Sequence, residues 1–87
     1  MAIWGADIAQ LKNLGSKLQA GSTEIENQRN TLNKVLAGTD WKGPDADKFR
    51  REWQGQHMTA LNKVAQALQE AGKKATQNAS EQEQASR

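Results

Sequence analysis

The first half of the chain carries large apolar residues at every seventh position. This repeat consists of Trp4, Leu11, Leu18, Ile25 and Leu32, and Ile8, Leu14, Val35 and Leu36 widen it at helical spacing. Apolar residues spaced by three, four or seven positions lie on one face of an α-helix. The pattern stops before Gly38, and glycine is the favoured residue just past a helix end. We therefore predict one long amphipathic helix over about residues 6–37.

A second apolar pattern begins after Pro44, whose fixed φ and missing N–H suit the first position of a helix. Asp45 and Asp47 then complement the positive end of the helix dipole. The apolar positions are Ala46, Phe49, Trp53, His57, Ala60, Leu61, Val64, Leu68, Ala71 and Ala75. The stretch from Thr76 to Arg87 is polar and does not continue them. We predict a second helix over about residues 45–75 and a mobile polar tail from there to the last residue.

Two long helices joined by a short turn, over about residues 38–44, pack against each other in opposite directions. The predicted fold is all-α: one domain formed by an antiparallel two-helix hairpin. A compact fold of this length buries only about 60% of the surface that its unfolded chain exposes. We expect a second hairpin to cover the apolar surface that is left, which completes a four-helix bundle. The predicted core or dimer face comprises Trp4, Ile8, Leu11, Leu18, Ile25, Leu32, Phe49, Trp53, His57, Leu61, Val64 and Leu68.

Small residues interrupt the middle of the first helix, where Gly15, Gly21 and Ser22 lie between the large apolar positions. Glycine inside a helix costs about 1 kcal/mol relative to alanine. One interpretation is that these residues allow a partner helix to approach closely. The other is that they are weak positions that the helix tolerates.

The composition offers little material for catalysis. The chain has no cysteine or tyrosine, a single histidine, His57, and no acidic pair at a spacing typical of a catalytic dyad or a metal site. We therefore expect no enzymatic activity, cofactor, metal or small-molecule substrate, and we expect His57 to pack in the core or at an interface. The net charge is only +2, and the basic patch of Lys48, Arg50 and Arg51 lies at helical spacing from acidic residues, so charge is a weak argument for nucleic-acid binding. No apolar run is long enough to span a membrane, and the first residues do not resemble a signal peptide.

The predicted turn contains Trp41-Lys42-Gly43 directly before Pro44. A Trp-x-Gly motif in the turn between two helices resembles the WXG100 family, and the resemblance covers nearly the whole chain. A second copy of the motif, Trp53-Gln54-Gly55, lies inside the second apolar pattern and not at the turn. We expect Trp41 to cover the end of the hairpin with its indole N–H bonded to a backbone carbonyl, and Gly43 to adopt a φ that other residues resist. Packing alone would explain Trp41, whereas the resemblance implies that this turn belongs to a recognition surface.

The resemblance implies a non-enzymatic protein that a bacterial type VII (ESX) secretion system exports from the cytoplasm without a signal peptide. It also implies a partner from the same family and recognition by an FtsK/SpoIIIE-type secretion ATPase. Many members or their partners carry a C-terminal Tyr-x-x-x-Asp/Glu signal, and this chain has no tyrosine. We therefore expect the partner to supply that signal as part of a composite surface, which favours a heterodimer over a homodimer.

Two other functions are compatible with the sequence: a helical adaptor that stays in the cytoplasm, and a helical DNA-binding protein. The adaptor would be retained in the cell. DNA binding would weaken steeply with salt, by about 0.9 log units per phosphate contact for each log unit of salt concentration.

Overall fold

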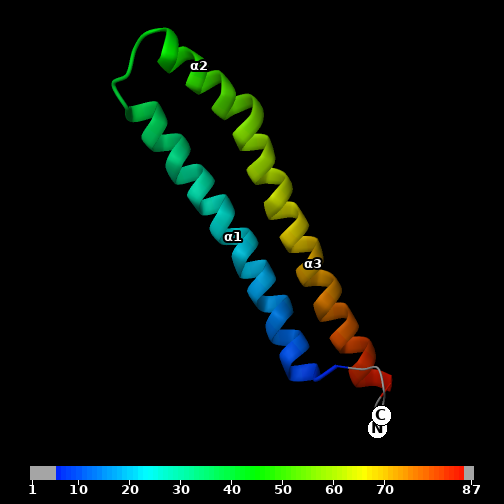
Figure 1. Cartoon of the computed structure of the whole chain (residues 1–87). Helices are drawn as coiled ribbons and strands as arrows, with labels where there is room; N and C mark the ends of the chain where they lie inside the picture. The colour runs from blue at the N-terminus through cyan, green and yellow to red at the C-terminus, as the bar shows by residue number, and fades with distance from the viewer. Residues whose placement is uncertain (1–5, 86–87) are drawn as a thin grey trace.

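The computed structural model describes residues 6–85, and these form only helices and short connections. Helix α1 spans Ile8–Gly38, and a second, bent helix consists of α2 (Pro44–Glu52), the π-helical turn η1 (Trp53–His57) and α3 (Met58–Ala85). α1 and α3 lie side by side and run in opposite directions, in a molecule 65 Å long and 17 × 15 Å across (Figure 1). The predicted all-α class is confirmed. The self-contained hairpin and its dimer stay predictions.

Local sequence explains where both helices begin. Asp7 precedes α1, and its carboxylate accepts a hydrogen bond at 3.0 Å from the backbone N–H of Gln10, a donor that the first helical turn leaves free. α2 begins at Pro44, directly after Gly43. The φ of Gly43 is 118°, a conformation that residues with side chains rarely adopt, so the expected special conformation of this glycine is confirmed. Loop 39–43 joins the two helices.

The second helix extends beyond its predicted end near residue 75, and the segment expected to be a polar tail is helical to Ala85. Contacts with the beginning of α1 explain the difference. Ala79 is completely buried, and the side-chain oxygen of Gln82 accepts a hydrogen bond at 2.8 Å from the backbone N–H of Ala6. These contacts hold the last turns of α3 against the beginning of α1, although the segment has no stripe of large apolar residues. One small residue is buried for every two helical turns, and polar side chains connect the two helices around it.

Apart from Ala46 on α2, the buried positions of the described residues form a seam of small residues, which we call the small-residue seam. It consists of Gly15 and Ser22 on α1, and Ala65, Gly72 and Ala79 on α3, at seven-residue spacing on each helix. A Cβ atom on Gly72 would lie 2.9 Å from the carbonyl oxygen of Gly15, which is closer than a Cβ atom can approach. The hydroxyl of Ser22 donates a 2.6 Å hydrogen bond to the carbonyl oxygen of Ala65. The seam therefore brings the two backbones close together.

The close-approach interpretation is thus confirmed for Gly15 and Ser22, and the approaching helix is α3 of the same chain. Gly21 is different. A Cβ atom at this position would lie 3.7 Å from Cδ1 of Leu68, which is an ordinary van der Waals distance. Gly21 is therefore not required for the approach of α3.

The bend in the second helix lies at η1, where the backbone N–H of Met58 bonds to the carbonyl oxygen of Trp53, five residues earlier. A bond over five residues instead of four inserts one extra residue into the turn. The half-buried side of the helix therefore passes from Trp53 to Met58 and not to His57. His57 is exposed, with its ring centroid 6.2 Å from that of Trp53, and the expectation that it packs in a core with α1 is wrong for this reason. Its place at an interface with another chain is still a prediction.

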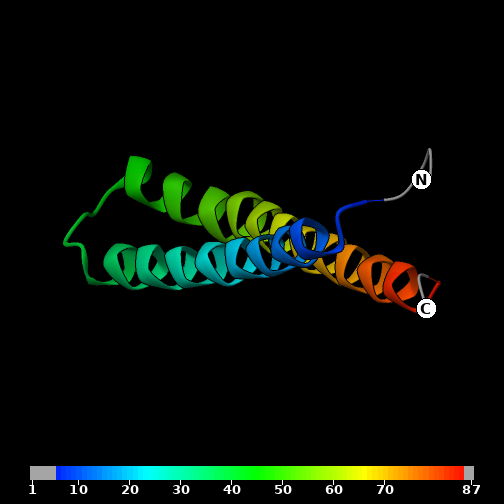
Figure 2. The same cartoon turned by 90° about the horizontal axis from the view of Figure 1, so that it is seen from below.

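The two ends of the molecule differ in how closely the helices approach. α1 and α3 stay together, whereas α2 diverges from the last turns of α1 (Figure 2). The divergence begins at η1. It leaves loop 39–43 to span the separated helix ends.

Candidate interaction surface

The helix pair has a polar side on which side chains connect α1 to α3. Arg29 donates a hydrogen bond to the side-chain oxygen of Asn62, and Lys12 forms an ion pair with Glu83 at 2.7 Å. A shallow polar groove follows this side and is lined by Gln19, Ser22, Thr23, Glu26, Gln69 and Lys73. Water competes for exposed groups of this kind, so these contacts orient the helices more than they stabilise them.

Asn33 makes the corresponding connection near the bend. Its side-chain oxygen accepts two hydrogen bonds, one from the indole N–H of Trp53 at 3.2 Å and one from the side-chain amide of Gln54 at 3.0 Å. One residue of α1 therefore holds the first two residues of η1. The sequence analysis did not identify Asn33, and an asparagine within a helix gives no local signal of such a role.

The opposite side exposes large aliphatic residues, which we call the open apolar face. It consists of Leu14, Leu32 and Val35 on α1 and Val64 on α3, whose exposed fractions are 49%, 46%, 59% and 48%. The small-residue seam explains this exposure. Where two helix backbones approach closely, bulky side chains cannot enter the seam and are displaced to its edge.

Gly21 locates this face relative to α3. Leu14, Gly21 and Val35 are separated by multiples of seven residues, so they lie on one stripe of α1. Gly21 approaches Leu68, which is one helical turn from Val64. The stripe of α1 and Val64 of α3 therefore border the same side of the molecule.

The residues predicted to form the core or dimer face lie at the edges of the seam or outside it. The half-buried members are Ile8, Leu11, Leu18, Ile25, Trp53, Leu61 and Leu68, and the exposed members are Leu32, Phe49, His57 and Val64. Trp4 lies outside the residues that the structure describes. The buried interior belongs instead to glycine, serine and alanine, which a search for large apolar residues overlooks.

An exposed aromatic pair connects loop 39–43 with α2. The rings of Trp41 and Phe49 have centroids 5.5 Å apart, and the two residues are 39% and 42% exposed. Within residues 6–85, the indole N–H of Trp41 donates no hydrogen bond, so the expectation that it would bond to a backbone carbonyl is wrong; the carbonyl oxygen of Trp41 instead accepts from Arg50. The indole ring packs on Phe49 of α2. We call Trp41 and Phe49 the aromatic tip.

Arg50 connects loop 39–43 to α2. Its Nη1 donates to the carbonyl oxygen of Trp41 at 2.7 Å, and its Nη2 donates to the carbonyl oxygen of Thr39 at 3.0 Å. Beside it, a cleft of about 200 Å³ separates α1 from the second helix and is lined by Asn33, Leu36, Ala37, Arg50 and Gln54. The sequence analysis grouped Arg50 with a solvated basic patch, since charge alone does not reveal which of two adjacent arginines turns inward.

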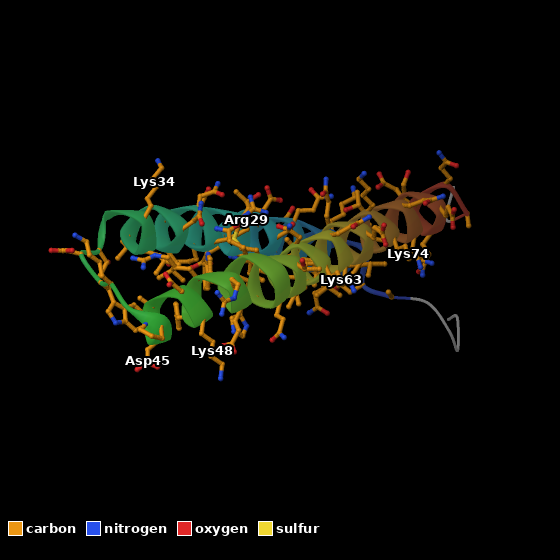
Figure 3. All side chains as sticks on the ribbon, turned by 90° about the horizontal axis from the view of Figure 1, so that it is seen from above. Arg29, Lys34, Asp45, Lys48, Lys63 and Lys74 are labelled. Carbon is orange, nitrogen blue, oxygen red and sulfur yellow. The ribbon has the colours of Figure 1, made fainter. Side chains whose placement is uncertain are left out.

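The charged side chains are otherwise dispersed. Lys34 and Lys48 point away from the helix pair on opposite sides (Figure 3). In the part of the chain that the structure describes, the ion pairs are Lys12 with Glu83 and the highly exposed Lys42 with Asp40.

Within residues 6–85, no group of three or more His, Cys, Asp or Glu residues is arranged to hold a metal ion. None of the described helices is both long and apolar enough to cross a membrane.

No protein-family model matches the chain, and neither a curated protein nor a solved structure shows significant similarity to it. The candidate interaction surface is therefore defined by its exposed apolar side chains: it consists of the open apolar face and the aromatic tip.

Proposed function

We propose that this chain is a non-enzymatic protein–protein interaction module of the WXG100 type, a helical hairpin that a type VII secretion system exports as a dimer with a related chain. The open apolar face is the observation that carries the proposal. Single exposed apolar residues are common on protein surfaces, whereas several on one side of a helix pair, here three on α1 and Val64 on α3, favour a surface that another protein covers. Leu14, Val35 and Val64 are each about half exposed without such a partner.

The pattern along α1 favours a helical partner. Leu11, Leu14, Leu18, Gly21 and Ile25 follow one another at alternating spacings of three and four residues. This spacing is typical of a helix that packs lengthwise against another helix. The residues of this pattern lie beside the small-residue seam on α1 and are not members of it. One side of α1 therefore packs against α3, and an adjacent side is available to a further helix. A four-helix bundle would use both.

The composite export signal follows from the resemblance and from the composition. Trp41 and Gly43 supply the Trp-x-Gly motif, while the absence of tyrosine means that a Tyr-x-x-x-Asp/Glu signal has to come from another chain. We propose that a second WXG100-like protein supplies it and that an FtsK/SpoIIIE-type ATPase recognises the combined surface. A heterodimer is the favoured assembly, and a homodimer is the alternative. Export then delivers the dimer from the cytoplasm to the outside of the cell.

Assembly can be tested by thermal unfolding over a wide range of protein concentration, with and without the candidate partner. We expect a helical chain whose melting temperature rises with concentration, because binding that requires the folded state stabilises it. Leu14→Glu should remove this dependence, since it introduces a charge into the open apolar face. Ser16→Glu, on an exposed position of the same helix, is the matched control. A monomer with a concentration-independent melting temperature under all conditions contradicts the dimer.

Export can be tested by immunoblots of culture supernatants and cell pellets from a strain that expresses the chain. We expect secretion to fall with Trp41→Ala and with removal of the partner's C-terminal residues, while the amount inside the cell rises. Retention of the unaltered protein in the cell would favour the cytoplasmic adaptor. Binding to DNA that decreases steeply with salt would favour the DNA-binding alternative.

A further inference from the structure

The conformation of loop 39–43 depends on few contacts with the rest of the molecule. At its first residue, Thr39, the backbone N–H bonds to the carbonyl oxygen of Leu36 at 3.3 Å and the hydroxyl donates to that of Val35 at 2.6 Å. At its last residue, the carbonyl oxygen of Gly43 accepts from the backbone N–H of Asp47 at 3.0 Å. Between these ends, the ion pair of Lys42 with Asp40 is local to the loop and almost fully exposed. Such a pair contributes little to order.

Apart from the Trp41 ring on Phe49, Arg50 supplies the contact of the middle of the loop with α2, and it is the one that holds the loop backbone. Its guanidinium bonds to the carbonyl oxygens of Thr39 and Trp41, which belong to the beginning and the middle of the loop. Thr39 is also the residue that caps α1, where the negative end of the helix dipole favours a cation. One side chain therefore ties the end of α1, the loop and α2 together.

The geometry of this contact is specific to arginine. A guanidinium presents several N–H groups in one rigid plane, so it can bond to two carbonyl oxygens at a fixed separation. Lysine presents a single ammonium group on a flexible chain and cannot fix both at once. Arg51 is the matched comparison, since it is the next residue, is exposed, and forms no hydrogen bond or ion pair within residues 6–85.

We propose that Arg50 is a positioning residue for recognition: it holds loop 39–43 so that Trp41 stays against Phe49 and remains exposed at the tip. This inference rests on the proposed function, in which the Trp-x-Gly loop belongs to the export surface. Arg50 acts through the loop. The two aromatic rings that it positions are each about 40% exposed, so a recognising protein can reach them.

The test compares Arg50→Gln, Arg50→Lys and Arg51→Gln in the full chain. The backbone order parameters of residues 40–42, measured by ¹⁵N relaxation, should fall from about 0.85 towards about 0.6 in Arg50→Gln, less in Arg50→Lys, and not in Arg51→Gln. The indole N–H resonance of Trp41, assigned by its loss in Trp41→Ala, should shift only in the two Arg50 variants. Helicity and melting temperature should stay close to those of the unaltered protein, which excludes general unfolding as the cause.

Export of the same variants completes the test. Arg50→Gln should lower secretion about as far as Trp41→Ala does, and Arg50→Lys should lower it less. Unchanged order parameters of residues 40–42 in Arg50→Gln overturn the positioning role, and so does a mobile loop with normal secretion while Trp41→Ala remains defective. Normal secretion of Trp41→Ala itself would instead contradict the role of the loop in the proposed function. If Arg50→Gln unfolds, Arg50→Lys carries the comparison with Arg51→Gln.

Discussion

The two ends of this molecule hold their helices in different ways. Between α1 and α3, the small-residue seam brings the backbones so close that Gly15 and Gly72 leave no space for a side chain. At the other end, α2 diverges from α1, and polar side chains make the connections: Asn33 of α1 bonds to η1, and Arg50 of α2 bonds to loop 39–43. The first end is held by backbone proximity and the second by directional hydrogen bonds.

The difference explains where the apolar surface lies. A close seam of small residues displaces the leucines and valines to its edge, which creates the open apolar face along most of the molecule. The divergent end instead exposes two aromatic rings, Trp41 and Phe49, which pack on each other. One end is thus suited to lengthwise association with helices. The other presents a compact tip for recognition.

The largest expected effect tests the close seam by comparing two glycine-to-alanine substitutions. Gly72→Ala should lower the free energy of unfolding by about 2–3 kcal/mol, because the new Cβ would collide with the backbone of Gly15 and force the helices apart. Gly21→Ala should raise it by about 0.5–1 kcal/mol, because alanine favours the helix and the position has space. Urea unfolding followed by circular dichroism measures both. Equal losses would show that the seam is not the closest contact between the helices.

A smaller effect should separate the two tryptophans of the divergent end. Trp53→Ala should cost about 2 kcal/mol, because it removes a half-buried ring and the indole hydrogen bond to Asn33. Trp41→Ala should cost less than about 1 kcal/mol, because its ring is exposed and packs mainly on Phe49. Unfolding curves of the two variants at one protein concentration decide this. A greater loss of stability in Trp41→Ala would mean that the loop contributes to the core.

The smallest effect tests the hydrogen bond within the seam. Ser22→Ala should lower the free energy of unfolding by about 1 kcal/mol, since the hydroxyl donates to Ala65 in a buried position. Ser16→Ala, at an exposed position of the same helix, should change it by less than about 0.5 kcal/mol. Both variants change helix propensity equally, so their difference reports the buried bond. If the two variants lose the same free energy of unfolding, the small size of the seam residues alone explains the close approach of the helices.

Local patterns predicted the helical elements well because they depend on nearby residues. The start of the second helix followed from Pro44 and Gly43, since their backbone restrictions act regardless of the surroundings. Its end was wrong because the contacts that extend it to Ala85 involve residues of α1 far away in the sequence. Of the candidate surface, Trp41 was identified from the motif, whereas Asn33 and Arg50 were not, because their partners are set by the packing of the helices.

The sequence by itself determined that the chain is helical and where α1 and α2 begin. It also determined that the chain has more large apolar side chains than one pair of helices can bury between them. These properties arise from backbone preferences and from spacing along a single helix. Only the tertiary structure decided that glycine, serine and alanine form the interior and that the larger residues face outward, because a three- and four-residue spacing is compatible with either set as the seam. It also decided, through the extra residue in η1, that Met58 and not His57 continues the half-buried side after Trp53. A one-residue change in helical register depends on how α2 and α3 each meet α1, and no local pattern records that.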